Sequence, residues 1–324
     1  MPNAIRISET GGPEVMKLVD VEVGDPGPGE AQVRNHAIGL NYIDTYYRSG
    51  LYPSPLPGGI GLEGAGVVTA VGPDVTNLKV GDRVAYATQP QPLGAYAELR
   101  NMPAAALLKL PRNVDFETAA AMMLKGLTAQ YLLRRTYKVQ KGQTILLHAA
   151  AGGVGLIATQ WAKALGVTVI GTAGSEEKAA LARKFGADHV ILYRQENVVE
   201  RVREITNGAM VPVVYDGVGK DTFEASIDCL QPFGLMVSFG NASGPVPPVP
   251  LTVLKGSLYL TRPSLMPHTA NRANLDEMAA DLFKVVGSGK VKIEIDQRYE
   301  LADAVRAHRD LEARRTTGST ILLP

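Results

Sequence analysis

The stretch "HAAAGGVG", residues 148–155, stands where an apolar run gives way to an amphipathic one. The run before it, "TILLHAA", is typical of a buried strand, and the run after it, "VGLIATQWAKALG", is typical of a helix. Gly152, Gly153 and Gly155 leave the backbone of the turn free of side chains, so it can approach a phosphate closely. The first N–H groups of the helix would point at the same phosphate. We therefore predict a dinucleotide-binding turn in which Gly152, Gly153 and Val154 contact the cofactor.

The spacing of these glycines departs from the common fingerprint G-x-G-x-x-G. That fingerprint would have its first glycine at Ala150, and here an additional glycine, Gly153, lies inside the motif. A glycine triplet alone would also suit a plain strand–turn–helix connection. Its setting favours dinucleotide binding, because strands and helices alternate repeatedly from residue 144 onwards.

The alternation itself predicts the fold class. Apolar strands are followed by amphipathic helices in the pairs "VTVIGTAG" and "SEEKAALARKFG", "HVILY" and "ENVVERVREITNG", and "VPVVYDGVG" and "DTFEASIDCLQPFG", before the final strands "GLMVSFGNAS" and "SLYLTRP". Strands that alternate with helices predict a parallel, doubly wound α/β (Rossmann) sheet with right-handed crossovers. We expect this dinucleotide-binding domain to span residues 125–266, after a helix over residues 116–136.

The part of the chain before this alternation has a different character. Residues 1–124 are rich in Gly, Pro and β-branched residues, with short strand-like runs such as "AQVRNHAIGLN", "GAGVVTAVG" and "GDRVAYA". These runs predict a mostly β domain, in the form of a partly open barrel. From residue 267 the pattern gives helix, strand, helix and a last strand, "TILLP". We expect residues 267–324 to return to the first domain, which would carry the substrate site.

The end of the second predicted strand, "GTAGS" (171–175), bears on which dinucleotide binds. Turns that bind NAD carry an acidic residue about 20 residues after the glycines, where it holds the ribose 2′-hydroxyl. This chain has Gly174 and Ser175 instead, and Lys178 lies in the first turn of the helix that Ser175 would cap. Tyr193 ends the next strand beside the same corner. These residues favour a 2′-phosphate and hence NADPH, although Lys178 also suits an ordinary solvent-facing position.

Composition narrows the class of partner. The 324 residues are 45% hydrophobic. They include 33 Lys and Arg and 32 Asp and Glu, which gives a net charge of +1. This balance gives no electrostatic reason to expect nucleic acid or a membrane as a partner. The single cysteine, Cys229, allows no internal disulfide, which fits a reducing compartment. With no signal pattern and no apolar run of roughly 18 residues, we expect a cytoplasmic protein.

The order of the domains resembles the medium-chain dehydrogenase/reductase superfamily, in which a GroES-like domain precedes a dinucleotide domain. Its alcohol dehydrogenases hold a catalytic zinc with Cys and His ligands. Where those enzymes have Gly-His-Glu, this chain reads Gly61-Leu62-Glu63, so Leu62 replaces the metal-binding histidine. Cys229 lies on a predicted helix far along the chain, and the five histidines show no ligand spacing. We therefore expect no metal site.

Several phrases carry a narrower resemblance, and they occur in the same order in the related proteins. They are "NYIDTYYRSGLYP", "GLEGAGVV", "KGLTAQYLL", "AAAGGVGLIATQWAKALG" and "GSLYLTRPSL". Together they resemble NADPH:quinone reductases of the zeta-crystallin type, over essentially the whole chain. The resemblance implies reduction of a quinone by NADPH without zinc.

The resemblance also implies roles for individual residues. It puts Asn41 and Tyr46 beside the nicotinamide. Asn41 offers an amide N–H to a carbonyl oxygen, and Tyr46 and Tyr52 offer flat faces and hydroxyl groups to a quinone, although packing would also account for both tyrosines. Further cofactor contacts implied in this way are Thr128, Phe239, Gly240, Asn241, Thr261, Arg262, Ser264 and Arg314. Of these, Arg314 equally suits an exposed surface position.

Other interpretations stay open. A reductase of activated C=C bonds, such as enones or alkenals, would share the fold, the cofactor and the absence of zinc, and a quinone could take either a hydride or single electrons. A non-catalytic NADPH-binding, RNA-binding or structural protein of the crystallin type is the alternative from another class. The last sheet strand, in "SLYLTRP", is expected at a sheet edge, which favours a homodimer. We expect His148 to be a packed strand residue and Asp216 to cap the turn that follows it.

Overall fold

The computed structural model describes residues 1–87 and 93–324. The chain divides into two compact units. Unit 1 contains residues 1–127, 266–283 and 293–324, and unit 2 contains residues 128–265 and 284–292. The short stretch 284–292 therefore belongs to unit 2, although the chain on both sides of it belongs to unit 1.

Unit 2 is built on a six-stranded sheet. Its strands, in the order in which they lie side by side, are β11 (His189–Leu192), β10 (Thr168–Ala173), β9 (Thr144–Leu147), β12 (Val211–Asp216), β13 (Leu230–Ser238) and β14 (Tyr259–Thr261). Its helices are α3 (Gly153–Ala164), α4 (Glu176–Lys184), α5 (Val198–Ile205) and α6 (Phe223–Asp228).

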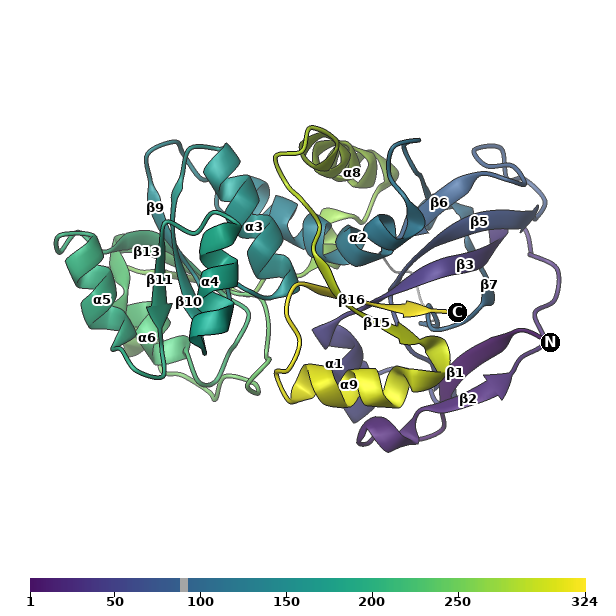
Figure 1. Cartoon of the computed structure of the whole chain (residues 1–324), viewed down its shortest axis with the longest axis horizontal. Coiled ribbons are helices and arrows are strands. Elements are labelled where there is room, and N and C mark those ends of the chain that lie inside the picture. The colour runs from purple at the N-terminus through teal and green to yellow at the C-terminus, as the bar shows by residue number, and fades with distance from the viewer. Residues whose placement is uncertain (88–92) are drawn as a thin grey trace. The chain divides into compact units, whose positions relative to one another are not determined.

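All neighbouring strands of this sheet are parallel. Numbered along the chain, the strands lie in the order 3-2-1-4-5-6, which is the order of dinucleotide-binding Rossmann folds. Helices α3 and α4 pack against each other, and so do α5 and α6 (Figure 1). The predicted doubly wound parallel sheet is therefore confirmed. In such a sheet, ligands bind beyond the carboxyl ends of the strands.

One element boundary differs from the prediction. The sequence predicts a helix through residue 234, but α6 ends at Asp228 and β13 begins at Leu230. Phe233 has a φ of +63°, and the pairing of β12 with β13 shifts register between Val211 and Val213. The additional residues thus form an irregular bulge in β13. Pairing with a strand nearly 20 residues away overrides the local helical pattern.

The described residues of unit 1 form two sheets. The larger has the order β15-β16-β3-β5-β6-β8, with β7 also paired to β3, and the smaller has the order β2-β1-β4. The strands are β1 (Asn3–Ile7), β2 (Lys17–Asp20), β3 (Glu30–Leu40), β4 (Gly58–Gly59), β5 (Glu63–Val71), β6 (Arg83–Tyr86), β7 (Leu99–Pro103), β8 (Leu108–Lys109), β15 (Ile295–Glu300) and β16 (Ser319–Leu323).

In the described part of the chain, five further α-helices lie outside the set given for the sheet of unit 2. They are α1 (Tyr42–Ser49), α2 (Phe116–Tyr131), α7 (Leu265–His268), α8 (Arg272–Gly287) and α9 (Ala304–Glu312). A π-helical turn, Leu132–Thr136, extends α2, so the predicted helix over residues 116–136 is confirmed. β16 pairs antiparallel with β3, so the last strand of the chain joins the larger sheet of unit 1.

Apolar side chains of β3 and β5 form part of the core of unit 1. Val33, Ile38 and Leu40 of β3 and Val68 of β5 are almost completely buried in one cluster. Burial of one such side chain contributes about 1.5–3 kcal/mol, so the strand that leads into α1 is held firmly. Within the described residues, no helix combines the length and the apolar character needed to cross a membrane.

Candidate active site

The turn between β9 and α3 brings backbone atoms unusually close together. A Cβ on Gly155 would lie 2.3 Å from the carbonyl oxygen of Ala149, so only glycine fits there. Ala149 has a φ of +52°, a left-handed conformation that costs a residue with a side chain about 1–2 kcal/mol. Ala150 is fully buried, and Gly171 of β10 leaves room for its methyl group. This explains how alanine replaces the first glycine of the fingerprint.

The start of α3 offers free donors to an anion. Its N-cap residue is Gly152, which makes no side-chain hydrogen bond to the first turn. The first N–H groups of a helix have no partners within the helix, and the helix dipole makes this end positive. The glycine cradle and the uncapped helix start therefore fit the pyrophosphate of a dinucleotide. Gly152, Gly153 and Val154 lie at this helix start, and their contact with the cofactor stays a prediction.

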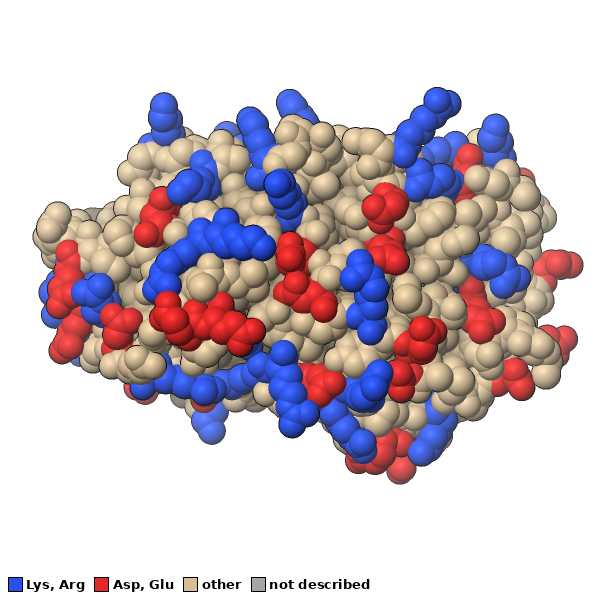
Figure 2. Space-filling model, in the orientation of Figure 1, with Lys and Arg blue, Asp and Glu red and all other residues tan. Residues whose placement is uncertain are grey.

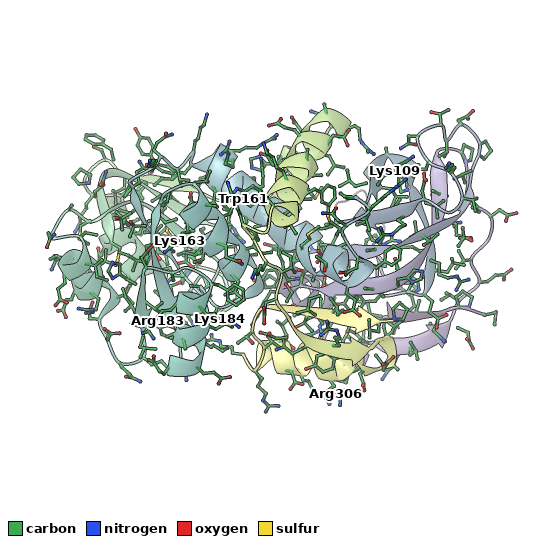
Figure 3. All side chains as sticks on the ribbon, turned by 45° about the horizontal axis from the view of Figure 1, so that its top comes forward. Lys109, Trp161, Lys163, Arg183, Lys184 and Arg306 are labelled. Carbon is green, nitrogen blue, oxygen red and sulfur yellow. The ribbon has the colours of Figure 1, made fainter. Side chains whose placement is uncertain are left out.

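The segment after β10 continues with Gly174 and Ser175, and Glu176 and Glu177 follow in the first turn of α4. The Ser175 hydroxyl caps α4 by accepting a hydrogen bond from the Lys178 N–H at 3.4 Å. A Cβ on Gly174 would lie 2.7 Å from the Tyr193 hydroxyl oxygen, so the residue after β11 meets this corner. The nearest acid, Glu176, pairs with Arg183 of the same helix at 2.6 Å, and Figure 3 shows Arg183 on α4. This corner fits a 2′-phosphate.

Residues beyond β13 and β14 form a third part of the same edge. One guanidinium nitrogen of Arg262 donates to the Ser238 carbonyl oxygen at 2.8 Å. When the amide of Asn241 is oriented to satisfy both its ends, it accepts from Arg262 at 3.0 Å and donates to the Gly240 carbonyl at 2.9 Å. Arg262 thus links the two strand ends. A direct contact between Arg262 and the cofactor stays a prediction.

The predicted cofactor residues of unit 2 mostly share one location. They lie at or after the carboxyl ends of β9, β10, β11, β13 and β14. These residues are Gly152, Gly153, Val154, Gly174, Ser175, Lys178, Tyr193, Phe239, Gly240, Asn241, Thr261, Arg262 and Ser264. Thr128 lies instead within α2, where it is buried. The parallel sheet therefore gathers residues that are more than 100 positions apart in the chain.

The predicted catalytic residues lie in unit 1, at helix α1. Asn41 is the N-cap residue of α1, and Tyr46 lies within the helix. The rings of Tyr46 and Tyr52 meet edge to face at a centroid distance of 5.2 Å, and the Tyr52 N–H donates to the Tyr46 carbonyl at 3.0 Å. Asn41 and Tyr46 are buried, and Tyr52 is half-buried. The structure therefore brings the two tyrosines together.

Sequence reasoning missed the group that contacts Asn41. The Asn41 amide nitrogen donates to Glu63 Oε2 at 2.7 Å, and Lys125 Nζ lies 3.6 Å from the same oxygen. Glu63 is completely buried, and this burial raises the pKa of its carboxyl group, whereas Lys125 and Asn41 act to lower it. The sequence feature that could have indicated this group is Glu63 itself, an acid at the start of the apolar strand in "GLEGAGVV".

A second missed network lies on the other side of Asn41. Asp44 accepts the Asn41 backbone N–H at 2.9 Å and the Tyr96 hydroxyl at 2.9 Å. The Tyr96 hydroxyl also lies 3.1 Å from His308 Nε2, and Arg48 lies 3.0 Å from His308 Nδ1. Burial raises the pKa of Asp44 to about 7 and, together with the charge of Arg48, lowers the pKa of His308 to about 3.

Arg314 also belongs to unit 1, where it follows α9. It is exposed and has a φ of +59°. Its charge acts to lower the pKa of Tyr42, although burial of Tyr42 has the larger, opposite effect. Arg314 is thus electrostatically coupled to the first residue of α1. Its contact with the cofactor remains a prediction.

Two polar residues of unit 2 have structural roles. His148 is buried between the hydroxyls of Thr172, at 3.1 Å, and Ser226, at 3.0 Å, and burial lowers its pKa. Asp216 accepts the backbone N–H groups of Val218 and Gly219, at 2.8 and 3.0 Å. The predictions of a packed histidine and a turn-capping aspartate are both confirmed.

The residues that could bind metal are dispersed. In the parts of the chain before residue 88 and after residue 92, no cluster of three or more His, Cys, Asp or Glu side chains could hold an ion. Leu62, which the sequence resemblance puts at the position of the metal-binding histidine, is buried. Cys229 is buried at the end of α6, and burial raises the pKa of its thiol to about 12.

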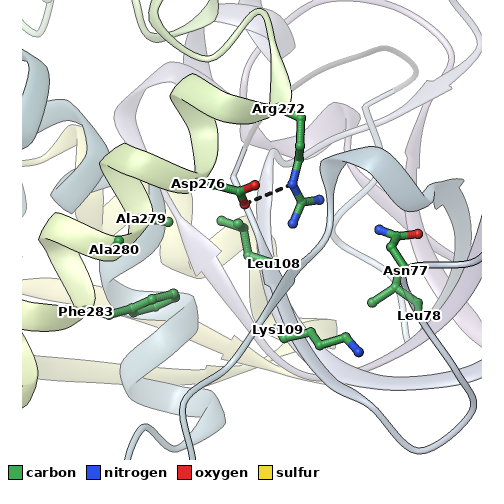
Figure 4. Close-up of a pocket in the computed structure, with 9 residues that line it drawn as sticks. All are labelled: Asn77, Leu78, Leu108, Lys109, Arg272, Asp276, Ala279, Ala280 and Phe283. Atoms are coloured by element: carbon green, nitrogen blue, oxygen red, sulfur yellow. Dashed lines mark hydrogen bonds and ion pairs between the residues drawn. The ribbon is translucent and has the colours of Figure 1, made fainter.

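One hollow of unit 1 is lined by charged side chains that already have partners. The hollow, of about 290 Å³, lies beside α8 (Figure 4), and its Arg272 binds Asp276 at 2.9 Å and the Leu107 carbonyl at 2.9 Å. Its Lys109 pairs with Asp82 at 2.9 Å. Figure 2 shows Lys and Arg interspersed with Asp and Glu over the visible face.

Comparison with known proteins gives matches to both parts of the chain. Residues 27–112 match the family model described as alcohol dehydrogenase GroES-like domain, and residues 153–283 match that described as zinc-binding dehydrogenase. A quinone oxidoreductase from Pseudomonas aeruginosa is 60% identical over 100% of both chains. A 2-haloacrylate reductase from a Burkholderia species is 46% identical over 100% of this chain and 99% of its own.

A solved structure agrees with the fold along the entire chain. The structure of Escherichia coli quinone oxidoreductase complexed with NADPH has a TM-score of 0.97 at 53% identity, covering 99% of this chain and 100% of that one. The Rossmann sheet and the GroES-like β domain define a medium-chain dehydrogenase/reductase fold. The chain belongs to the quinone oxidoreductase family of this superfamily.

Proposed function

We propose that this protein reduces quinones with NADPH and requires no metal. One observation carries the proposal: a quinone oxidoreductase 60% identical to this chain matches it from end to end. The local geometry supports it, because the glycine cradle before α3 suits a pyrophosphate and the position after β10 holds the neutral Ser175, ahead of Glu176 and Glu177 in the first turn of α4. Bound NADPH supplies a hydride, which with one proton from solvent converts a quinone to a hydroquinone.

The chain's own residues bind and orient the reactants. We assign pyrophosphate binding to Gly152, Gly153 and Val154, and 2′-phosphate binding to Ser175 and Lys178. The remaining cofactor contacts of this assignment are Gly174, Tyr193, Thr128, Phe239, Gly240, Asn241, Thr261, Arg262, Ser264 and Arg314. NADPH binding is thus assigned to residues 125–266, and substrate binding to residues 1–124 and 267–324.

The reacting groups would meet residues of α1 and the segment after it. We assign contact with the nicotinamide to Asn41 and Tyr46, and contact with the quinone to Tyr46 and Tyr52. Tyr46 and Tyr52, which meet edge to face, supply aromatic rings of the kind on which a quinone can stack. An amide or hydroxyl donor would stabilise the negative charge that develops on the quinone oxygen. Reduction of a quinone restores aromaticity, so no strong acid is required.

Reduction of activated C=C bonds is a second candidate function. The 46% identity to a 2-haloacrylate reductase supports it. The deciding experiment measures NADPH oxidation with a panel of p-quinones, 2-alkenals and 2-haloacrylates and identifies each product. We expect p-quinones to react with the highest kcat/KM. Faster turnover of the alkenes would reassign the substrate, and binding of NADPH without reduction of any acceptor would favour a structural or RNA-binding role.

The number of electrons transferred in one step needs a separate measurement. Hydride transfer delivers two electrons together, so we expect hydroquinone to form without a free semiquinone. Electron paramagnetic resonance of a reacting sample tests this expectation. A semiquinone signal that grows with enzyme concentration would assign one-electron reduction instead.

Assembly and location are proposed on separate grounds. We propose a homodimer, because β14 is an edge strand of the sheet of unit 2 and its Tyr259 and Leu260 are exposed. We propose a cytoplasmic location, because the chain has one buried cysteine and no capacity for an internal disulfide. Nucleic acid is not proposed as a partner, since the net charge is only +1.

A further inference from the structure

A fully buried carboxylate in unit 1 has no part in the function assigned so far. Glu63 is the first residue of β5 and pairs across the sheet with Gly39 of β3. A Cβ on Gly39 would lie 2.1 Å from Glu63 Oε2 and 2.3 Å from the Ala120 carbonyl oxygen. The backbone of β3 is therefore shaped to leave a space into which the carboxylate fits.

The described partners of this carboxylate come from two segments, the N-cap of α1 and the helix α2. Glu63 Oε2 accepts from the Asn41 amide nitrogen at 2.7 Å, and Oε1 accepts from the Leu124 backbone N–H at 2.8 Å. Lys125 Nζ lies 3.6 Å from Oε2 and donates to the Leu40 carbonyl oxygen at 3.2 Å. The carboxylate thus joins the N-terminus of α1 to α2, with the lysine as its counter-charge.

Stability alone is a weak reason to retain such a group. Removal of a carboxylate and an ammonium group from water costs more than their attraction usually returns, and apolar replacements of buried ion pairs are often as stable or more so. The ion pair of Glu63 and Lys125 is distinctive because Glu63 also binds Asn41, which is only 4% exposed. An ionised carboxylate only accepts hydrogen bonds, so it selects the nitrogen end of the amide.

We infer that Glu63, with Lys125 as its counter-charge, is a positioning residue that sets the orientation of the Asn41 amide for the reaction. This inference rests on the proposed function, in which Asn41 contacts the nicotinamide. One amide N–H is held by Glu63, and the second N–H and the amide oxygen are thereby fixed in direction. Asp44 holds the backbone of the same residue at 2.9 Å, so Asn41 is restrained at both its main chain and its side chain.

A double-mutant cycle tests whether Glu63 acts through Asn41. Turnover of NADPH with 1,4-benzoquinone is measured for the wild type, Asn41→Ala, Glu63→Gln and the double variant. Removal of one catalytic hydrogen-bond donor commonly lowers kcat by about 100-fold or more, and we expect at least about a tenfold loss in each single variant. We expect the double variant to resemble Asn41→Ala, because groups that act as a unit are strongly non-additive.

A matched control separates this role from a general effect of losing a carboxylate. Asp82 also accepts a backbone N–H, that of Lys79 at 3.0 Å, and pairs with a lysine, Lys109, at 2.9 Å. It has no described contact with Asn41. We expect Asp82→Asn to retain kcat within about twofold, and we expect the Kd for NADPH to change by less than about threefold in Glu63→Gln.

A second variant keeps the inference testable if Glu63→Gln does not fold. Lys125 lowers the pKa of Glu63, so Lys125→Met should let Glu63 gain a proton at a higher pH. A protonated carboxyl group can donate, and it no longer selects the nitrogen end of the amide. We expect kcat of Lys125→Met to fall, relative to wild type, as the pH is lowered.

The outcomes are distinguishable. Wild-type protein that reduces no quinone overturns the proposed function and the positioning role with it. If the wild type is active, any one of three results overturns the positioning role alone. They are multiplicative losses in the double variant, unchanged turnover in Glu63→Gln, and parallel pH profiles for Lys125→Met and wild type.

Discussion

At the scale of single residues, the proposed preference for NADPH rests on Ser175, a neutral residue that follows β10 where NAD-binding turns carry an acid. Ser175 occupies the strand end and caps α4, while Glu176 is engaged by Arg183 at 2.6 Å. An acid at the strand end would repel a 2′-phosphate and would accept the 2′-hydroxyl of NADH. The neutral hydroxyl of Ser175 imposes no such repulsion.

The substitution Ser175→Asp tests this directly. Aspartate caps a helix as well as serine does, so α4 should be retained while a negative charge is added. We expect kcat/KM for NADPH to fall at least about tenfold, a change of about 1.4 kcal/mol, with little change for NADH. Ser175→Asn is the neutral control and should leave the NADPH value within about threefold. Equal losses in both variants would point to the cap instead of the charge.

Two buried residues near Asn41 have opposite effects on how the free energy of unfolding changes with pH. The folded state raises the pKa of Asp44 from 3.8 to about 7 and lowers the pKa of His308 from 6.5 to about 3. Between about pH 4 and 6.5, folding therefore adds one proton at Asp44 and removes one at His308. These two contributions offset one another, so the pair makes the wild-type stability nearly independent of pH in this window.

Removing either partner should expose the contribution of the other. In Asp44→Asn, only the histidine responds, so the free energy of unfolding should decrease as pH falls from about 6.5 towards 3. In His308→Gln, only the aspartate of this pair responds, so the free energy of unfolding should decrease as pH rises from about 4 to 7. Each slope should approach about 1.4 kcal/mol per pH unit, measured by urea unfolding. Slopes of the same sign in the two variants would contradict this assignment.

At the scale of secondary structure, the β9–α3 turn depends on one glycine inside the helix. A Cβ on Gly155 would clash with the backbone of Ala149 and Ala150, at 2.3 and 2.8 Å. Because backbone cannot move aside as a side chain can, Gly155→Ala should displace the start of α3. We expect a loss of about 1–3 kcal/mol in stability and a weaker Kd for NADPH, measured by urea unfolding and by fluorescence titration.

The control for this prediction is a glycine with space around it. A Cβ on Gly24 would meet no atom within 4 Å, so Gly24→Ala should change neither the Kd nor the stability by more than about 0.5 kcal/mol. If Gly155→Ala binds NADPH like wild type, close backbone approach at this turn is not required for the cofactor.

The elements of the sheets could be predicted because their signals are local. Apolar runs separated by amphipathic runs predicted every strand of the unit 2 sheet, and the return of the last strands to unit 1 followed from their pattern. The start of β13 was predicted wrongly, since its pairing with β12 is not visible in the local sequence. The Asn41–Glu63–Lys125 cluster was missed for the same reason, because 22 and 62 residues separate its members along the chain.

At the scale of the whole molecule, the exposed edge of the unit 2 sheet bears on assembly. β14 pairs with β13 on one side and is the last strand in the order of the sheet. Tyr259 is 59% exposed and Leu260 is 40% exposed, so apolar side chains accompany unpaired backbone groups. Edge strands of this kind pair readily with another copy unless charges, proline or a covering segment prevent it.

A charged edge should therefore yield a monomer. For the wild type we expect twice the chain mass of 34.5 kDa in sedimentation equilibrium, and for Tyr259→Lys combined with Leu260→Lys we expect the single mass. Lysine at an edge repels an identical strand brought alongside it, which is why this pair of changes is chosen. Val80→Lys, at a 60% exposed position of unit 1, is the matched control and should retain the wild-type mass. A wild-type protein that sediments at 34.5 kDa would refute the homodimer, and a dimer that survives both lysines would assign its interface to another surface.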